Sequence, residues 1–105
     1  MVTRLRELKI FSGSANPAFA QEIADHLRVS VASSKRFRFA DGEIGISIEE
    51  SVRGADVYVV QSTCRPVNEN LMELLIMVDA LRRASAYRIN VVTPDAVQPI
   101  LDIID

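Results

Sequence analysis

The residues of this sequence best suited to hold a ligand gather around one turn. Phe39 precedes two carboxylates, Asp41 and Glu43, which flank Gly42. An aromatic ring stacks on a flat base, and adjacent carboxylates accept hydrogen bonds from amino groups or hydroxyls. The group therefore suits adenine or ribose recognition. The alternative is a solvated turn whose charges keep a strand edge from aggregating.

A second group has the parts of a phosphate site. Ser51 and Arg53 supply a hydroxyl and a guanidinium beside the flexible Gly54, and Ser85 adds a further hydroxyl later in the chain. Arginine binds phosphate in a bidentate manner. Taken alone, such clusters are also common in ordinary polar turns, so both interpretations stay open.

No residue stands out as catalytic or metal-binding. The sequence has neither a Gly-x-x-x-x-Gly-Lys nor a Gly-x-Gly-x-x-Gly motif. The single histidine, His26, has no second ligand nearby, and we interpret it as a half-exposed helix residue. Cys64 follows a predicted strand, but without a histidine partner we interpret it as a small loop residue.

The first half of the chain predicts a strand, a helix and a hairpin. An apolar strand over 8–12 is followed by Asn16-Pro17, which start a helix that runs to about Arg28 with an apolar stripe ending at Leu27. Period-two alternation over 35–49 predicts two strands, and Asp41-Gly42 between them predicts a tight turn whose central residues take positive φ.

The second half predicts a strand, a helix and a strand. Residues 56–61 are typical of a central strand covered on both faces. Residues 68–84 form a helix that is apolar around most of its circumference, and hence buried on several sides or shared with a partner; residues 88–93 form a last strand. This order predicts an α/β layered domain with a mainly parallel sheet and a protruding antiparallel hairpin.

Composition limits the class of protein. The chain has 105 residues, which predicts a single domain spanning 1–105. Its net charge of −2 argues against non-specific binding of nucleic acid, and it lacks an apolar run long enough for a membrane span. One cysteine predicts a reducing compartment, the cytoplasm by default.

Four segments together resemble the amino-terminal domain of the ribose-phosphate pyrophosphokinase (phosphoribosyl pyrophosphate synthetase) family. They read Arg-Phe-Ala-Asp-Gly-Glu over 38–43, Ile-Glu-Glu-Ser-Val-Arg-Gly-Ala-Asp-Val-Tyr over 48–58, Val-Gln-Ser-Thr over 60–63, and Pro-Val-Asn-Glu-Asn-Leu-Met-Glu-Leu-Leu-Ile-Met-Val-Asp-Ala-Leu-Arg-Arg-Ala-Ser-Ala over 66–86. The resemblance covers about 8–92 and less than a third of a usual family member.

The resemblance implies a phosphoribosyltransferase-like three-layer fold and a magnesium-dependent transfer of a diphosphoryl group from ATP to ribose 5-phosphate. It also implies hexamers in which the hairpin reaches a neighbouring subunit. By this resemblance Phe39, Asp41 and Glu43 complete the neighbour's ATP site. Ser51, Arg53 and Ser85 match positions that bind the phosphates of regulatory ADP or inorganic phosphate.

Residues 93–105 depart from the family pattern, and the family's ATP-gripping, catalytic and ribose 5-phosphate segments have no counterpart here. Apolar spacing over 95–105 fits a short amphipathic helix. We expect a partial synthetase, inactive alone because it lacks the cations that stabilise a transferring group. The alternatives are a non-catalytic regulatory or oligomerisation module, pairing with itself or with full-length synthetase through the hairpin and the apolar helix, and a free-standing nucleotide binder.

Overall fold

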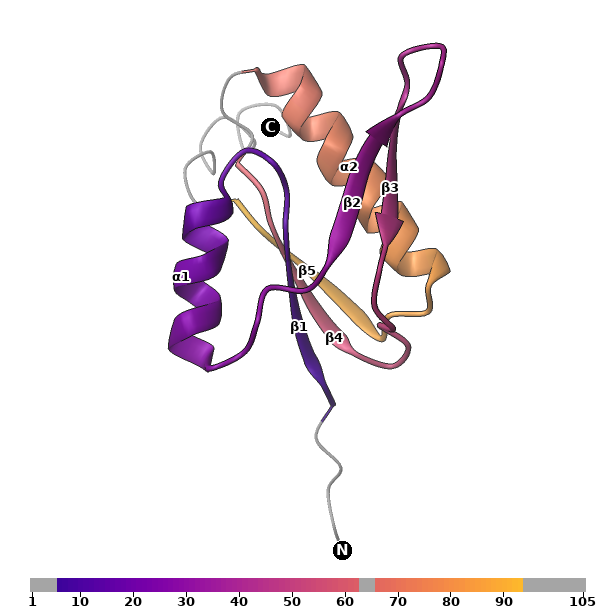
Figure 1. Cartoon of the computed structure of the whole chain (residues 1–105). Helices are drawn as coiled ribbons and strands as arrows, with labels where there is room; N and C mark the ends of the chain where they lie inside the picture. Colours follow the sequence, from indigo (N-terminus) through magenta and orange to yellow (C-terminus); the bar gives the residue numbers. More distant parts are fainter. Residues whose placement is uncertain (1–5, 63–65, 94–105) are drawn as a thin grey trace, which may run out of the picture.

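The structure is a computed structural model that describes residues 6–62 and 66–93. Cys64 and the predicted helix over 95–105 lie outside these described residues. The elements follow in the order β1 (Leu8–Ser12), α1 (Pro17–Leu27), β2 (Ser34–Arg38), β3 (Ile44–Ile48), β4 (Asp56–Val60), α2 (Val67–Arg83) and β5 (Arg88–Val92) (Figure 1).

A parallel sheet of order β1-β4-β5 forms the middle of the domain. Strand β4 pairs with β1 on one side and with β5 on the other, so its predicted central place is confirmed. Val57, Val59 and Val60 are fully buried. The prediction that both faces of β4 are covered was wrong at Tyr58, which is 37% exposed. Tyr58 tolerates this position because its ring is apolar and its hydroxyl can stay in water.

The two helices cover opposite faces of this sheet (Figure 1). Ala20 and Ala24 of α1 pack with Ile10 and Val60. The larger cluster, on the α2 side, holds Phe11, Val57, Val59, Leu74, Met77 and Leu81. This arrangement confirms the predicted three-layer α/β architecture. Among the residues described, no helix is long and apolar enough to cross a membrane.

Helix α1 begins and ends where local chemistry favours it. The side chain of Asn16 accepts a hydrogen bond from the Phe19 amide at 3.3 Å, and Pro17 occupies the first turn. Arg28 takes a left-handed conformation with φ 58° and ends the helix. Leu27, predicted to lie on the apolar stripe, is 50% exposed because the helix ends at this residue and no neighbour covers it.

Strands β2 and β3 form the predicted antiparallel hairpin, with Phe37 opposite Gly45. The Phe39 amide donates to the Glu43 carbonyl at 2.8 Å, and the Gly42 amide donates to the Phe39 carbonyl at 2.9 Å. Within this turn only Gly42 has positive φ, at 92°, so the expectation that Asp41 also has positive φ was wrong. The loop has three residues between the bonded pair, which needs one left-handed position instead of two.

The hairpin packs on α2 through β3, whose Ile46 and Ile48 lie against the main core cluster. Helix α2 is buried along one face only. Its residues Val67, Leu71, Met72 and Leu75 are exposed, so burial on several sides was wrong for the single chain. The sheet and the hairpin cannot encircle a helix that lies at the surface of a three-layer domain.

Candidate functional site

The tip of the hairpin brings its three predicted ligand-binding side chains together. Phe39, Asp41 and Glu43 are all exposed, and the hydrogen bond from the Phe39 amide to the Glu43 carbonyl holds the two ends of the turn together. The Glu43 amide donates to Oδ1 of Asp41 at 3.1 Å, which fixes one oxygen of that carboxylate in the turn. The other carboxylate oxygen of Asp41 accepts no hydrogen bond within this turn.

The ring of Phe39 is oriented by Phe37. The two ring centroids are 5.1 Å apart at 76°, an edge-to-face contact, and Phe39 remains 54% exposed. Below them a groove of about 660 Å³ runs between the hairpin and α2, with Phe39, Glu43, Leu75 and Asp79 among its lining residues. A ring that is oriented yet exposed can accept a flat partner on its free side.

Arg38 links the tip to the start of α2. Its guanidinium donates to the Gly42 carbonyl at 3.0 Å and lies 3.9 Å from the Glu69 carboxylate. Both side chains are more than half exposed, so this pair adds little to the free energy of folding. It does bring the tip of the hairpin close to the first turn of α2.

The second predicted group lies at the other end of the sheet, where β4 and β5 begin. The Gly54 amide donates to the Ser85 carbonyl at 3.0 Å, so the turn that carries Arg53 contacts the turn that follows α2. Ser85 has φ 69°, and Ser51, Arg53 and Ser85 are exposed. The structure therefore brings the Arg53 and Ser85 turns together, far from the hairpin tip (Figure 1).

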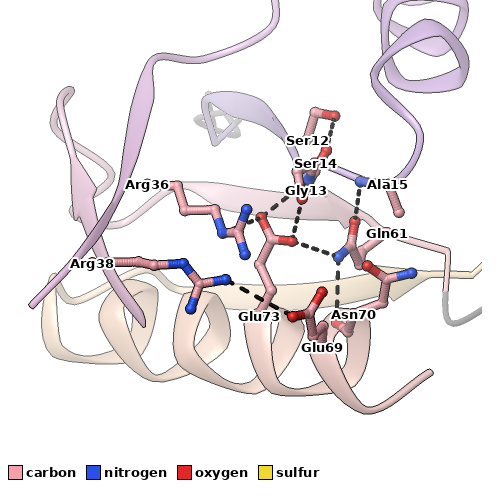
Figure 2. A network of polar contacts seen from close by, with 10 residues as sticks. All are labelled: Ser12, Gly13, Ser14, Ala15, Arg36, Arg38, Gln61, Glu69, Asn70 and Glu73. Atoms are coloured by element: carbon pink, nitrogen blue, oxygen red, sulfur yellow. Dashed lines mark hydrogen bonds and ion pairs between the residues drawn. The ribbon is translucent and has the colours of Figure 1, made fainter. Parts of the chain in front are cut away.

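A buried polar network lies where β1 and β4 end, and the sequence reasoning missed it (Figure 2). Glu73 of α2 is 3% exposed. Its Oε1 accepts from the Ser14 hydroxyl at 2.6 Å and from Nε2 of Gln61 at 2.9 Å, while Oε2 accepts from the Ser14 amide at 3.1 Å. Gln61 also accepts from the Ala15 amide and donates to the Asn70 carbonyl.

This network occupies the edge at which open α/β sheets place ligands, beyond the carboxyl ends of the parallel strands. Arg36 of the hairpin reaches the same place, with its Nε 4.0 Å from Oε2 of Glu73. A hollow of about 300 Å³ there is lined by residues that include Ser14, Ser33, Arg36 and Glu73. The signal for it in the sequence was Glu73 itself, a charge within the apolar run of α2.

A further ion pair anchors the base of the hairpin. Nζ of Lys9 is 2.6 Å from Oε1 of Glu50, and Oε2 of Glu50 accepts from the Ser33 amide at 2.7 Å. The hydrogen bond from Lys9, with that from Ser33, lowers the pKa of Glu50 below its ordinary value of 4.5. The same bond raises the pKa of Lys9 above 10.5.

Within 6–62 and 66–93, no group of three or more His, Cys, Asp or Glu side chains is placed to hold a metal ion. His26 is exposed beside Glu22 and Asp25 at the surface of α1. The described residues thus form no all-protein metal site, and we assign magnesium no ligand among them.

The fold and these sites define an open α/β domain that carries exposed polar and aromatic side chains on a hairpin and on the turns at its sheet edges. The N-terminal domain of ribose phosphate pyrophosphokinase matches residues 8–96. The chain belongs to this family, as the resemblance indicated.

Similar proteins agree with this assignment. Ribose-phosphate pyrophosphokinase of Caldanaerobacter subterraneus is 58% identical over 94 residues, which are 90% of this chain and 30% of the relative. The chloroplastic ribose-phosphate pyrophosphokinase 1 of Arabidopsis thaliana is 62% identical over 87 residues, which are 83% of this chain and 22% of the relative. The chain thus spans under a third of the length of these two relatives.

A solved structure confirms the fold. The phosphoribosylpyrophosphate synthetase of Mycobacterium smegmatis superposes with a TM-score of 0.83 at 43% identity, covering 92% of this chain and 33% of that chain.

Proposed function

We propose that this chain is the hairpin-bearing domain of a ribose-phosphate pyrophosphokinase and that its hairpin tip completes the ATP site of a second subunit. The family reaction transfers a diphosphoryl group from ATP to ribose 5-phosphate with magnesium. One observation carries the proposal: Phe39 is held on edge by Phe37 while more than half of it stays exposed, beside Asp41 and Glu43.

The tip residues have distinct proposed roles. Phe39 stacks on the adenine ring with its free face. Glu43 and the free oxygen of Asp41 accept hydrogen bonds from amino or hydroxyl groups of the nucleotide. Magnesium bound by a complete enzyme of this family would neutralise charge on the phosphates, and we assign it no ligand among the tip residues.

We further propose that Ser51, Arg53 and Ser85 bind phosphate in a regulatory site. The contact between Gly54 and Ser85 supports this proposal because it joins the two turns that carry these side chains. Arg53 supplies the charge, and the serine hydroxyls supply donors for phosphate oxygens. Such a site suits inorganic phosphate or the phosphates of ADP.

We propose that the 105-residue chain is a single domain and is catalytically inactive alone. We also propose that it works in a reducing compartment such as the cytoplasm. A turnover assay with ATP, magnesium and ribose 5-phosphate tests the inactivity, and product formed by the chain alone would refute it. Mixing with the full-length Caldanaerobacter relative then tests the role of the tip.

The mixing experiment compares the wild-type chain with Phe39→Ala. We expect both to co-elute with the relative, because Phe39 is exposed in the single chain and the other contact surfaces are unchanged. Turnover per full-length subunit should then be lower with Phe39→Ala. Equal turnover with the two chains, at equal co-elution, contradicts the proposed role of the tip.

A non-catalytic oligomerisation module is the second candidate. The exposed apolar side chains of α2 favour it, since such surfaces commonly bind a partner. Under this hypothesis light scattering shows a dimer or larger homo-oligomer, whereas turnover of the relative is insensitive to Phe39→Ala. A free-standing nucleotide binder would instead give saturable heat with ATP in the absence of any relative.

A further inference from the structure

The hairpin is tied to the rest of the domain by charged pairs at three levels. Lys9 and Glu50 join its base to β1 at 2.6 Å. Arg36 approaches Glu73 at 4.0 Å near its middle, and Arg38 approaches Glu69 at 3.9 Å near its tip. Both arginines come from β2, and both of these glutamates come from α2, as Figure 2 shows.

The two upper pairs define one register of the hairpin along the helix. Arg36 and Arg38 are two residues apart on a strand, a rise of about 6.6 Å. Glu69 and Glu73 are four residues apart on a helix, a rise of about 6 Å. The two spacings match, so both pairs form together when β2 runs antiparallel to α2, and a slip of two residues would break one of them.

The two glutamates differ in how firmly they are held. The Glu69 side chain is 59% exposed, whereas that of Glu73 is 4% exposed. Three hydrogen bonds from Ser14 and Gln61 fix the Glu73 carboxylate at the sheet edge. A carboxylate fixed in this way keeps its position when the hairpin moves. The ion pair with Arg36 therefore forms only when the hairpin lies in one position along α2.

We propose that Glu73 is a positioning residue that sets the place of the hairpin through Arg36 and thereby aims Phe39 at the nucleotide of a second subunit. The positioning stands on the contacts within this chain. Only the consequence for the nucleotide rests on the proposed function. Because Glu73 also accepts hydrogen bonds from Ser14, it links the position of the hairpin to the carboxyl edge of the sheet.

Amide hydrogen exchange of this chain tests the positioning. An isolated two-stranded hairpin is marginally stable, so a hairpin that is held less firmly on α2 opens more often and its amides lose protection. We expect Arg36→Gln to raise the exchange rate of the Phe39 amide about tenfold while the amides of β4 stay unchanged. Arg36→Lys keeps the charge and should restore most of the protection. Lys35→Gln, which removes a positive charge from an exposed position of the same strand, is the matched control and should change the rate less than Arg36→Gln does.

Glu73→Gln should raise the Phe39 exchange rate as Arg36→Gln does, and the double variant should add nothing further, because both changes remove one interaction. Unchanged Phe39 exchange in Arg36→Gln, or fully additive effects in the double variant, overturns the proposal. If Glu73→Gln does not fold, the comparison of Arg36→Gln with Arg36→Lys decides, since Arg36 is partly exposed and its loss leaves the core intact.

A kinetic readout separates this inference from the proposed function. In the mixed assembly with the Caldanaerobacter relative, Arg36→Gln should raise KM for ATP with kcat unchanged. Faster hairpin exchange without a change in KM supports the positioning and refutes the role of the tip at the nucleotide. Unchanged exchange refutes the positioning whatever the value of KM.

Discussion

The ring of Phe37 covers the backbone of Gly45, its partner across the hairpin, so closely that a Cβ at Gly45 would lie 2.5 Å from two of the ring atoms. The same Cβ would lie 3.0 Å from the ring of Phe39. The position of both aromatic rings therefore depends on a residue without a side chain in the facing strand.

Gly45→Ala should consequently displace Phe37 and disturb its edge-to-face contact with Phe39. The atoms in the way belong to side chains, so the rings can move, and we expect a loss of about 1–3 kcal/mol in the free energy of unfolding. Urea unfolding measures this loss, and the NMR signals of the two phenyl rings report the displacement.

Gly42→Ala is the control for that prediction. Gly42 has φ 92° and nothing within 4 Å of an added Cβ, so its substitution strains the backbone without touching either ring. We expect a cost of about 1 kcal/mol with unchanged ring signals. Unchanged ring signals in Gly45→Ala as well would contradict the packing described here.

Gly13→Ala should be more damaging, because the added Cβ collides with the side-chain amide of Gln61. Gln61 is fully buried and bonded to Ala15, Asn70 and Glu73, so it has no room to withdraw. Each buried polar group left without a partner costs about 1–3 kcal/mol. We expect a loss of about 3 kcal/mol or more in urea unfolding.

Gly54→Ala provides the comparison for Gly13→Ala. Gly54 has φ 72° and open space around an added Cβ, so only backbone strain of about 1 kcal/mol applies. A cost at Gly13 no larger than that at Gly54 would show that the polar network yields easily and that Gln61 is not fixed.

Local patterns were sufficient to predict the elements of the fold. The alternation of Phe37 with Arg36 and Arg38 predicts a strand because period two is a property of the extended chain itself. Asn16-Pro17 predicts the start of α1 because capping acts within one turn of helix. The Asp41-Gly42 pair between the two alternating segments placed the tip residues at a turn, because tight hairpin turns favour this pair.

The polar network and the anchors of the hairpin depend on contacts between distant segments, which local patterns do not contain. Glu73 meets Ser14 across 59 positions, and Lys9 meets Glu50 across 41. The exposed face of α2 was also beyond reach, since apolar side chains around a helix do not say which of them a neighbouring layer covers. Whether Ser51, Arg53 and Ser85 bind phosphate stays a prediction.

The ion pair between Lys9 and Glu50 should make stability depend on pH in a defined direction. The folded pKa of Glu50 is lowered below 4.5, so its contribution is present above 4.5 and is lost as the pH falls through the lowered value. The folded pKa of Lys9 is raised above 10.5, so its contribution is present below 10.5 and is lost as the pH rises through the raised value.

Glu50→Gln should therefore cost about 1 kcal/mol at neutral pH, where the pair is charged on both sides. The difference from the wild-type chain should shrink as the pH is lowered below the folded pKa of Glu50. Urea unfolding across this acidic range measures it. Glu49→Gln changes the same charge at an exposed neighbour, and a pH dependence equal in both variants would argue against the pair as its source.

Phe39→Ala should separate binding from folding. Its ring is 54% exposed and contacts Phe37 by an edge, so its removal should cost less than about 1.5 kcal/mol, the upper range for an aromatic pair. A larger loss in urea unfolding would place the ring in the core. If the tip completes a nucleotide site, the same variant should raise KM for ATP in the mixed assembly.

Asp41→Asn is the companion test, because asparagine keeps an Oδ1 that can accept from the Glu43 amide, as Oδ1 of Asp41 does at 3.1 Å. The turn should hold its shape while one negative charge disappears. A raised KM for ATP with unchanged stability would then trace binding to the free carboxylate oxygen. An unchanged KM would leave Phe39 and Glu43 as the residues that bind, since the turn alone does not need the charge.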